Sequence, residues 1–195
     1  LWLIGLAAVF DFVDGLSARL LKASSSIGKQ LDSFADLISF GLLPSVILFI
    51  LIKESLYIAA LAKVGIFNYH HLGVNMAEIF KFIPYIAFLI PLFSAFRLAK
   101  FNIDTRQSDS FIGLPTPANA ILIGSLPLIL ANDNFHLSPI ILNSYFLIPT
   151  IFLLCYLLIS KLSLFSLKFK NISWDQNKIR FIFLLISLVL IIMLT

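Results

Sequence analysis

The sequence predicts an all-α membrane protein, a polytopic bundle of about six transmembrane helices. Of its 195 residues, 60% are apolar and 12% are charged, whereas soluble domains contain about 45–50% apolar and about 25% charged residues. The apolar stretches are long and continuous, whereas transmembrane strands alternate over about ten residues. These observations exclude a soluble enzyme and a disordered chain. The single cysteine, Cys155, also excludes a secreted disulfide scaffold.

The first three predicted helices are separated by polar or charged residues. A spanning helix needs about 20 apolar residues. The first stretch, 1–21, begins without a methionine, so we expect at least one span to be missing before it. The second stretch, 30–52, follows a polar turn at 22–28, and the third is 82–99. The segment between the second and the third is too polar to span. We expect an interfacial helix and a loop there, and the membrane depth of residues 53–66 stays open.

Three further apolar stretches complete the bundle, at 114–131, 140–160 and 180–195. The connections between helices carry alternately many and few basic residues, eleven on one side and three on the other. Because Lys and Arg concentrate in cytoplasmic loops, the turn at 22–28 is predicted to face the cytoplasm. The scattered basic residues indicate contact with anionic lipid headgroups, and we expect no nucleic-acid partner. Residues 1–195 are treated as one membrane-embedded domain.

Four of the ten acidic residues lie within 26 positions around this turn, namely Asp11, Asp14, Asp32 and Asp36. Asp11 and Asp14 are three residues apart, and Asp32 and Asp36 are four apart, so each pair shares one helix face. The short turn makes the two helices antiparallel neighbours, and at 1.5 Å per residue the four positions overlap in depth within about two turns. All four carboxylates can therefore line one cavity just below the cytoplasmic surface.

Such a cavity has the chemistry of a metal site. Carboxylate oxygens suit Mg²⁺ or Mn²⁺, and two ions about 4 Å apart can stabilise the entering and leaving oxygens of a phosphoryl displacement. Arg19 adds a fixed cation for phosphate. The small residues Gly15, Ala18 and Gly28 permit close approach of a nucleotide or of another helix.

Spacing alone leaves two alternatives open. The acids could form salt bridges with Arg19, Lys22 and Lys29 in a purely structural helix pair. However, the lysines should extend to the membrane interface and leave the deeper aspartates unpaired. The acids could also belong to an ion-conducting site. Against transport, they crowd at one surface and the later spans carry almost none.

The acidic segment resembles a known family motif. Eight specified positions match at the expected spacing, and the pattern resembles the signature D-x2-D-G-x2-A-R-x8-G-x3-D-x3-D of the CDP-alcohol phosphatidyltransferase family. The matching residues are Asp11, Asp14, Gly15, Ala18, Arg19, Gly28, Asp32 and Asp36.

This resemblance implies that the chain transfers a phosphatidyl or similar group from a CDP-linked donor to an alcohol and releases CMP. It implies that Asp11, Asp14, Asp32 and Asp36 hold two divalent cations, Mg²⁺ or Mn²⁺. Asp36 would also act as the general base that takes the proton of the acceptor hydroxyl. By the same resemblance, the nucleotide would lie against Gly15, Ala18 and Gly28, and Arg19 would contact its phosphates.

Further stretches resemble the bacterial phosphatidylserine synthase branch of the family. Ser33 stands where phosphatidylglycerophosphate synthases typically have proline, and Leu37 where they have lysine. Lys100 replaces an expected arginine, which is a mild departure. The last two helices contribute no diagnostic residues. The resembling stretches are 30–44, 97–102 and 111–118.

Arg97, at the cytoplasmic end of the third span, has two readings. It can anchor the helix at the membrane interface, or its guanidinium group can bind the serine carboxylate or a donor phosphate in a bidentate manner. We adopt a substrate-binding role as the hypothesis.

The resemblance thus implies an enzyme of the bacterial inner membrane, with its active site facing the cytoplasm, that joins L-serine to CDP-diacylglycerol. It also implies a homodimer. The alternatives are another acceptor, glycerol 3-phosphate or inositol phosphate, or a divalent-cation transporter.

Overall fold

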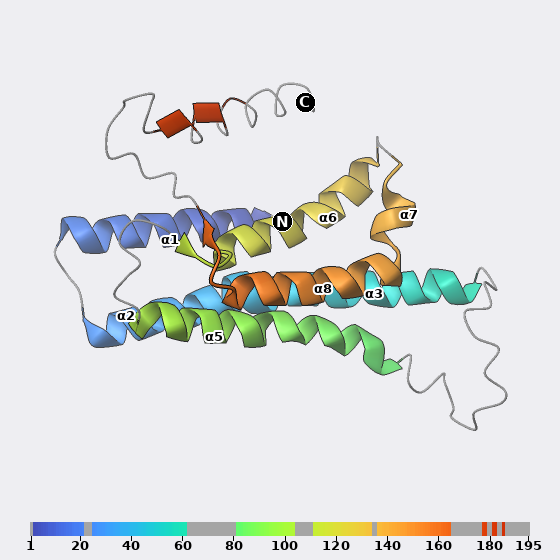
Figure 1. Cartoon of the computed structure of the whole chain (residues 1–195), viewed down its shortest axis with the longest axis horizontal. Helices are drawn as coiled ribbons and strands as arrows, with labels where there is room; N and C mark the ends of the chain where they lie inside the picture. Colours follow the sequence, from blue (N-terminus) through green and yellow to red (C-terminus); the bar gives the residue numbers. More distant parts are fainter. Residues whose placement is uncertain are drawn as a thin grey trace.

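The computed structural model describes residues 2–21, 25–61, 81–103, 111–133 and 136–164, together with 177–178, 181–182 and 185. Long helices run beside one another in an elongated bundle (Figure 1). Within the described ranges, β-structure is limited to two-residue strands, β1 (Phe111–Ile112) and β2 (Ser163–Leu164), which pair antiparallel. The prediction of an all-α fold is confirmed.

The N-terminal part consists of one helix and then a long continuous one. Helix α1 spans Trp2–Leu20, and α2 (Ser26–Asp36) runs through a π-helical segment, η1 (Leu37–Leu42), into α3 (Leu43–Leu61). Helix α2 begins where it does because Ser25 has extended backbone angles and its side chain accepts the backbone N–H of Gly28 at 2.9 Å.

The second span was predicted at 30–52, but the helix is longer at both ends. It begins at Ser26 and continues through Lys53 and Glu54 to Leu61. The part of the predicted interfacial segment before residue 62 is therefore a direct extension of the spanning helix, and residues 62–80 lie outside the described residues. Lys53 and Glu54 are exposed, so their charged ends stay off the buried face and the helix can continue.

The remaining described helices lie close to their predicted places. The third predicted span corresponds to a 3₁₀ turn, η2 (Ile83–Phe88), followed by α5 (Leu89–Ile103). The fourth corresponds to α6 (Thr116–Asn132). Pro115 precedes its first residue and Pro117 lies in its first turn, where proline is well tolerated. The fifth contains the short α7 (Ser138–Ile141) and α8 (Ser144–Ile159). The predicted span 180–195 falls almost entirely outside the described residues.

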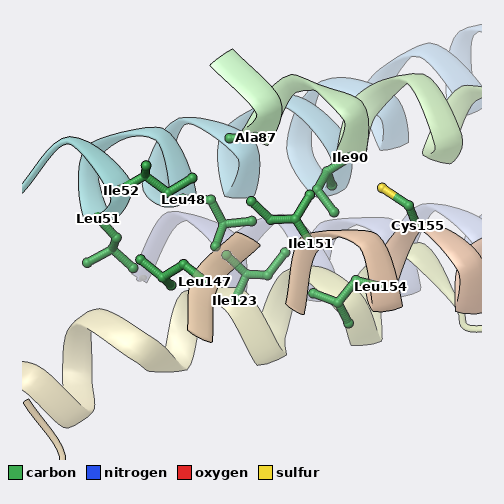
Figure 2. Close-up of a cluster of buried hydrophobic side chains, with 10 residues drawn as sticks. All are labelled: Leu48, Leu51, Ile52, Ala87, Ile90, Ile123, Leu147, Ile151, Leu154 and Cys155. Atoms are coloured by element: carbon green, nitrogen blue, oxygen red, sulfur yellow. The ribbon is translucent and has the colours of Figure 1, made fainter. Parts of the chain in front are cut away.

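A buried apolar cluster holds the middle of the bundle together. Figure 2 shows side chains from α3, η2, α5, α6 and α8 converging between the helices, with Leu48, Ile90 and Ile151 close to its centre. Cys155 is part of this cluster and is buried, in agreement with its place in an apolar run. The full set is Leu48, Leu51, Ile52, Ala87, Ile90, Ile123, Leu147, Ile151, Leu154 and Cys155.

The outer faces of the helices are also apolar. Phe10 of α1, Phe96 of α5 and Tyr156 of α8 are each more than 60% exposed, whereas soluble monomers rarely expose large contiguous apolar patches. Two helical segments of the described chain, Ser26–Ala59 and Ile83–Ile103, are long and apolar enough to cross a membrane, and α6 and α8 are shorter apolar helices. The number of six spans stays a prediction.

A second, smaller cluster orients the N-terminal helices at one end of the bundle. Ile4 of α1, Phe40 of η1 and Ala120 of α6 are buried against one another. One turn further along α6, Ile123 joins the main cluster with Leu48 of α3. Helix α6 therefore runs in the same direction as α3, and its first turn lies at the same end of the bundle as α2.

Candidate active site

Three of the four predicted aspartates meet at this end of the bundle. Asp11 projects from α1, and Asp32 and Asp36 project from α2. Each offers one carboxylate oxygen, and these three oxygens lie within 4.8 Å of one another. Asp11 and Asp36 are within hydrogen-bonding reach and are partly buried, whereas Asp32 is exposed. The arrangement is thus open to water on one side and enclosed on the other.

The fourth aspartate, Asp14, lies at the edge of this cluster. It is exposed and is not among the three residues whose oxygens converge, although it is near enough to interact electrostatically with Asp11 and Asp32. The predicted convergence of all four carboxylates is therefore seen for three of them. Helix α1 packs mainly against η1 and α6. The side chain of Asp11 therefore reaches from α1 toward Asp32 and Asp36 of α2.

The remaining motif residues are only partly described. Gly15 is half-buried on α1, and the side chains of Ala18 and Arg19 lie outside the described residues. Gly28 has a local structural role, since a Cβ there would come within 3.0 Å of the Ser25 Oγ that begins α2. Its absence of a side chain therefore preserves the cap.

Lys29 does not neutralise the aspartates. Its ammonium group donates to the backbone carbonyl of Asn102 at 2.8 Å, and the Asn102 side-chain amide donates to Ser33 Oγ at 2.9 Å. These contacts hold the end of α5 antiparallel against the start of α2. Among the described side chains no salt bridge to the four aspartates is seen, and the side chain of Arg19 is not one of them. Lys22 also lies outside the described residues.

The helix geometry changes directly after Asp36. Segment η1 is π-helical, and such segments occur frequently at functional sites. Gly41, within η1, faces α5 at close range, since a Cβ on it would lie 3.3 Å from both the Pro91 Cα and the Ser94 Cβ. The absence of a side chain at Gly41 lets α5 approach the turn that follows Asp36.

This approach places Arg97 beside the acidic cluster. Arg97 is one turn beyond Ser94 on α5, is only 8% exposed, and interacts electrostatically with Asp36. The Arg97 guanidinium is therefore buried beside Asp36, and its role as a substrate ligand stays a prediction. Its Nε has no hydrogen-bond partner among the described residues.

Three further polar residues near the cluster were not singled out from the sequence. Ser94, Thr116 and Asn119 are at most 1% exposed. Thr116 lies in the resembling stretch 111–118. For Ser94 and Asn119 the only sequence signal was a polar residue in an apolar helix, and that pattern does not show which face such a residue occupies.

Comparison with known proteins places the chain in a family. The family model described as CDP-alcohol phosphatidyltransferase matches residues 1–193. The chain belongs to the CDP-alcohol phosphatidyltransferase family. It is therefore a transferase, and the transporter alternative is not supported.

Several similar proteins carry the same name, CDP-diacylglycerol–serine O-phosphatidyltransferase. One from Helicobacter pylori (strain ATCC 700392 / 26695) is 32% identical over 192 residues, which cover 97% of this chain and 69% of that protein. One from Bacillus subtilis is 34% identical over 107 residues, covering 55% of this chain and 48% of that protein. One from Methanocaldococcus jannaschii is 34% identical over 121 residues, which cover 62% of this chain and 46% of that protein. No solved structure matches the chain.

The chemistry of the site fits the divalent metal that the family resemblance implies. Three carboxylate oxygens within 4.8 Å are the hard donors that Mg²⁺ and Mn²⁺ take. Three negative charges this close to one another repel, and a divalent cation held among them would offset that repulsion. The described residues therefore form a cluster that could hold a metal ion.

Proposed function

We propose that this transferase joins the phosphatidyl group of CDP-diacylglycerol to the hydroxyl of L-serine, giving phosphatidylserine and CMP. The observation that carries the proposal is the convergence of Asp11, Asp32 and Asp36 within 4.8 Å, in a family whose similar members are named as serine transferases. The acyl chains of the donor would lie in the bilayer, and serine would arrive from the cytoplasm. Inner-membrane location and a homodimer belong to the same proposal.

In this proposal Asp36 is the general base. It is the aspartate next to the buried Arg97, and it lies at the inner end of α2. The serine Oγ–H donates its proton to the Asp36 carboxylate as Oγ attacks the phosphorus that carries diacylglycerol. A new P–O bond forms to serine, the bridging P–O bond of the diphosphate breaks, and CMP leaves with the electron pair.

The other residues bind and orient. Asp11, Asp14, Asp32 and Asp36 would hold two divalent cations, which when bound would supply positive charge for the oxygens of the diphosphate. Arg19 would contact these oxygens from the cytoplasmic side, and the nucleotide would lie against Gly15, Ala18 and Gly28. Arg97 would bind a substrate anion. A buried guanidinium can do so strongly because little water competes for its donors.

The proposal is tested with the purified full chain in detergent. CDP-diacylglycerol and Mg²⁺ or Mn²⁺ are supplied with L-serine, glycerol 3-phosphate or inositol phosphate, and released CMP is measured. We expect CMP release that depends on serine and equals the phosphatidylserine formed. CMP release with another alcohol alone would overturn serine as the acceptor while leaving the family activity intact.

A further inference from the structure

Four buried polar side chains near the inner end of the acidic cluster carry atoms without a hydrogen-bond partner. Ser94 and Arg97 come from α5, and Thr116 and Asn119 come from α6. Within the described residues, five of their atoms are buried and make no hydrogen bond. These are Ser94 Oγ, Arg97 Nε, Thr116 Oγ1, and both Oδ1 and Nδ2 of Asn119. Most buried polar groups in proteins are hydrogen-bonded, so this concentration of unpaired groups indicates a ligand.

Contacts of η1 with α5 and α6 bring the four polar residues close to one another. Segment η1 packs against both α5 and α6. On the α5 side, Ser94 faces Gly41 of η1. On the α6 side, Ala120, which follows Asn119, is buried against Phe40 of η1. Ser94 and Asn119 therefore flank the same turn of η1.

The other two residues lie one helical turn closer to the aspartates. Arg97 is three residues after Ser94, and it interacts with Asp36. Thr116 is three residues before Asn119, at the first turn of α6, which lies at the same end of the bundle as α2. Each pair thus shares one helix face that leads from η1 toward Asp36.

The chemistry of the four groups selects the ligand. The guanidinium of Arg97 requires an anion, the Asn119 carbonyl can accept from a cation, and the hydroxyls of Ser94 and Thr116 can donate or accept. Within the described residues, Arg97 is the one basic side chain that is buried, so a doubly charged phosphate would remain poorly compensated. A small zwitterion with a carboxylate and an ammonium group matches the set.

We infer that Ser94, Arg97, Thr116 and Asn119 form the pocket for the α-amino and α-carboxyl groups of an amino acid acceptor whose hydroxyl reaches Asp36. Arg97 binds the carboxylate, and Asn119 accepts a hydrogen bond from the ammonium group. The two hydroxyls complete the hydrogen bonds of these charged groups. This inference rests on the proposed function and assigns its acceptor site.

The test replaces polar groups by apolar groups of similar shape. Asn119→Leu and Thr116→Val are compared with Thr150→Val and Ser125→Ala, whose parent hydroxyls bond within their own helices to Phe146 O and Leu122 O. In the full chain in detergent, we expect Asn119→Leu to raise the KM for L-serine by about 10- to 100-fold, the range for a hydrogen bond to a charged group. The KM for CDP-diacylglycerol should change less than twofold, and Thr116→Val should shift only the serine KM in the same direction.

Two further readouts separate binding from a structural role. The melting temperature without substrate should stay equal or rise in Asn119→Leu, because an unpaired buried amide is removed, while the stabilisation by added L-serine should disappear. Asn119→Leu should also weaken the use of serine more than that of 3-hydroxypropionate, which lacks the ammonium group.

The possible failures are distinguishable. If the wild-type chain releases no CMP with serine, the proposed acceptor itself is wrong, and this inference is wrong with it. If wild type uses serine but both variants keep its KM, the pocket assignment alone is wrong. A parallel rise of both KM values with a lower melting temperature would show that Asn119 and Thr116 are structural, and would also overturn the assignment.

Discussion

At the scale of single residues, the position of Asp36 distinguishes it from the other acids. It closes α2, is half-buried, touches Asp11 and interacts with Arg97. Asp14, in contrast, is exposed at the rim. The aspartates of one motif thus differ in exposure, from Asp14 in water to Asp36 at the partly buried end of the cluster.

We predict that Asp36→Asn lowers kcat for CMP release by at least about 100-fold, because a positioned general base contributes roughly 10²- to 10⁴-fold. In metal-free buffer its melting temperature should be equal to or above that of the wild type, since one of three close negative charges is lost. The matched control is Glu54→Gln, an exposed carboxylate on α3, which should change neither quantity. Retention of wild-type turnover by Asp36→Asn would rule out the base role.

Residue spacing predicted the acidic cluster but not its surroundings. Intervals of three and four residues fix which side chains share a helix face, so the meeting of Asp11, Asp32 and Asp36 followed from the pattern. The burial of Asn119 did not, because an isolated polar residue in an apolar helix can face lipid, a neighbour or a ligand. The structure decides this, because Asn119 is fully buried between the helices.

At the scale of elements, α2 depends on its first turn. Ser25 begins the helix, and the Lys29 and Ser33 contacts with Asn102 tie it to α5. The direction in which Asp32 and Asp36 project is therefore fixed at the end of the helix that faces water.

We predict that Ser25→Ala destabilises the chain by about 0.5–2 kcal/mol, as loss of an N-terminal cap does, and lowers kcat/KM. Thermal unfolding and CMP release in detergent measure the two effects. Ser17→Ala is the control, since the Ser17 hydroxyl bonds to the Val13 carbonyl within α1 and caps nothing. Equal loss of stability in both variants would contradict a capping role.

The π-helical segment η1 is an element that the sequence did not predict. Its apolar pattern continues that of a regular helix, and nothing in the sequence marks the close packing of Gly41 against α5. The extension of α3 to Leu61 was also missed. The charged residues at 53 and 54 suggested that the helix ends there, but both lie on an exposed face and the helix continues past them.

We predict that Gly41→Val lowers stability by about 1–3 kcal/mol through overpacking and lowers kcat, because η1 must move away from Pro91 and Ser94 and take Asp36 with it. Gly5→Val on α1 is the matched control, since nothing lies within 4 Å of a Cβ there. Unfolding temperature and turnover are measured together. The contact would be unimportant for the site if the two valine variants behaved alike.

At the scale of the whole molecule, the acidic cluster lies at one end of an elongated bundle whose flanks are apolar. This layout suits a lipid-linked donor and a water-soluble acceptor that meet at a membrane surface. The composition and the long apolar stretches were enough to predict the apolar helical bundle. The number of spans does not follow from composition, because helices of 16 and 17 residues such as α8 and α6 are at the lower limit for crossing.

We predict that the end carrying the aspartates faces the cytoplasm. The chain has one cysteine, Cys155, which is 2% exposed, so a maleimide should react only with a new surface cysteine. In intact spheroplasts, a membrane-impermeant maleimide should label Asn132→Cys and not Ser26→Cys, and inside-out vesicles should reverse the result. Labelling of Ser26→Cys from outside would invert the topology and the proposed site location.

The continuous helix from Ser26 to Ala59 has 34 residues, which at 1.5 Å per residue corresponds to about 50 Å. The hydrocarbon core of a bilayer is only about 30 Å thick. Part of this helix must therefore project beyond the acyl chains or tilt, and the two aspartates near its first turns move with it. In a thicker or thinner membrane the same segment would sit at a different height or angle, so the depth of the aspartates below the membrane surface would depend on the composition of the bilayer.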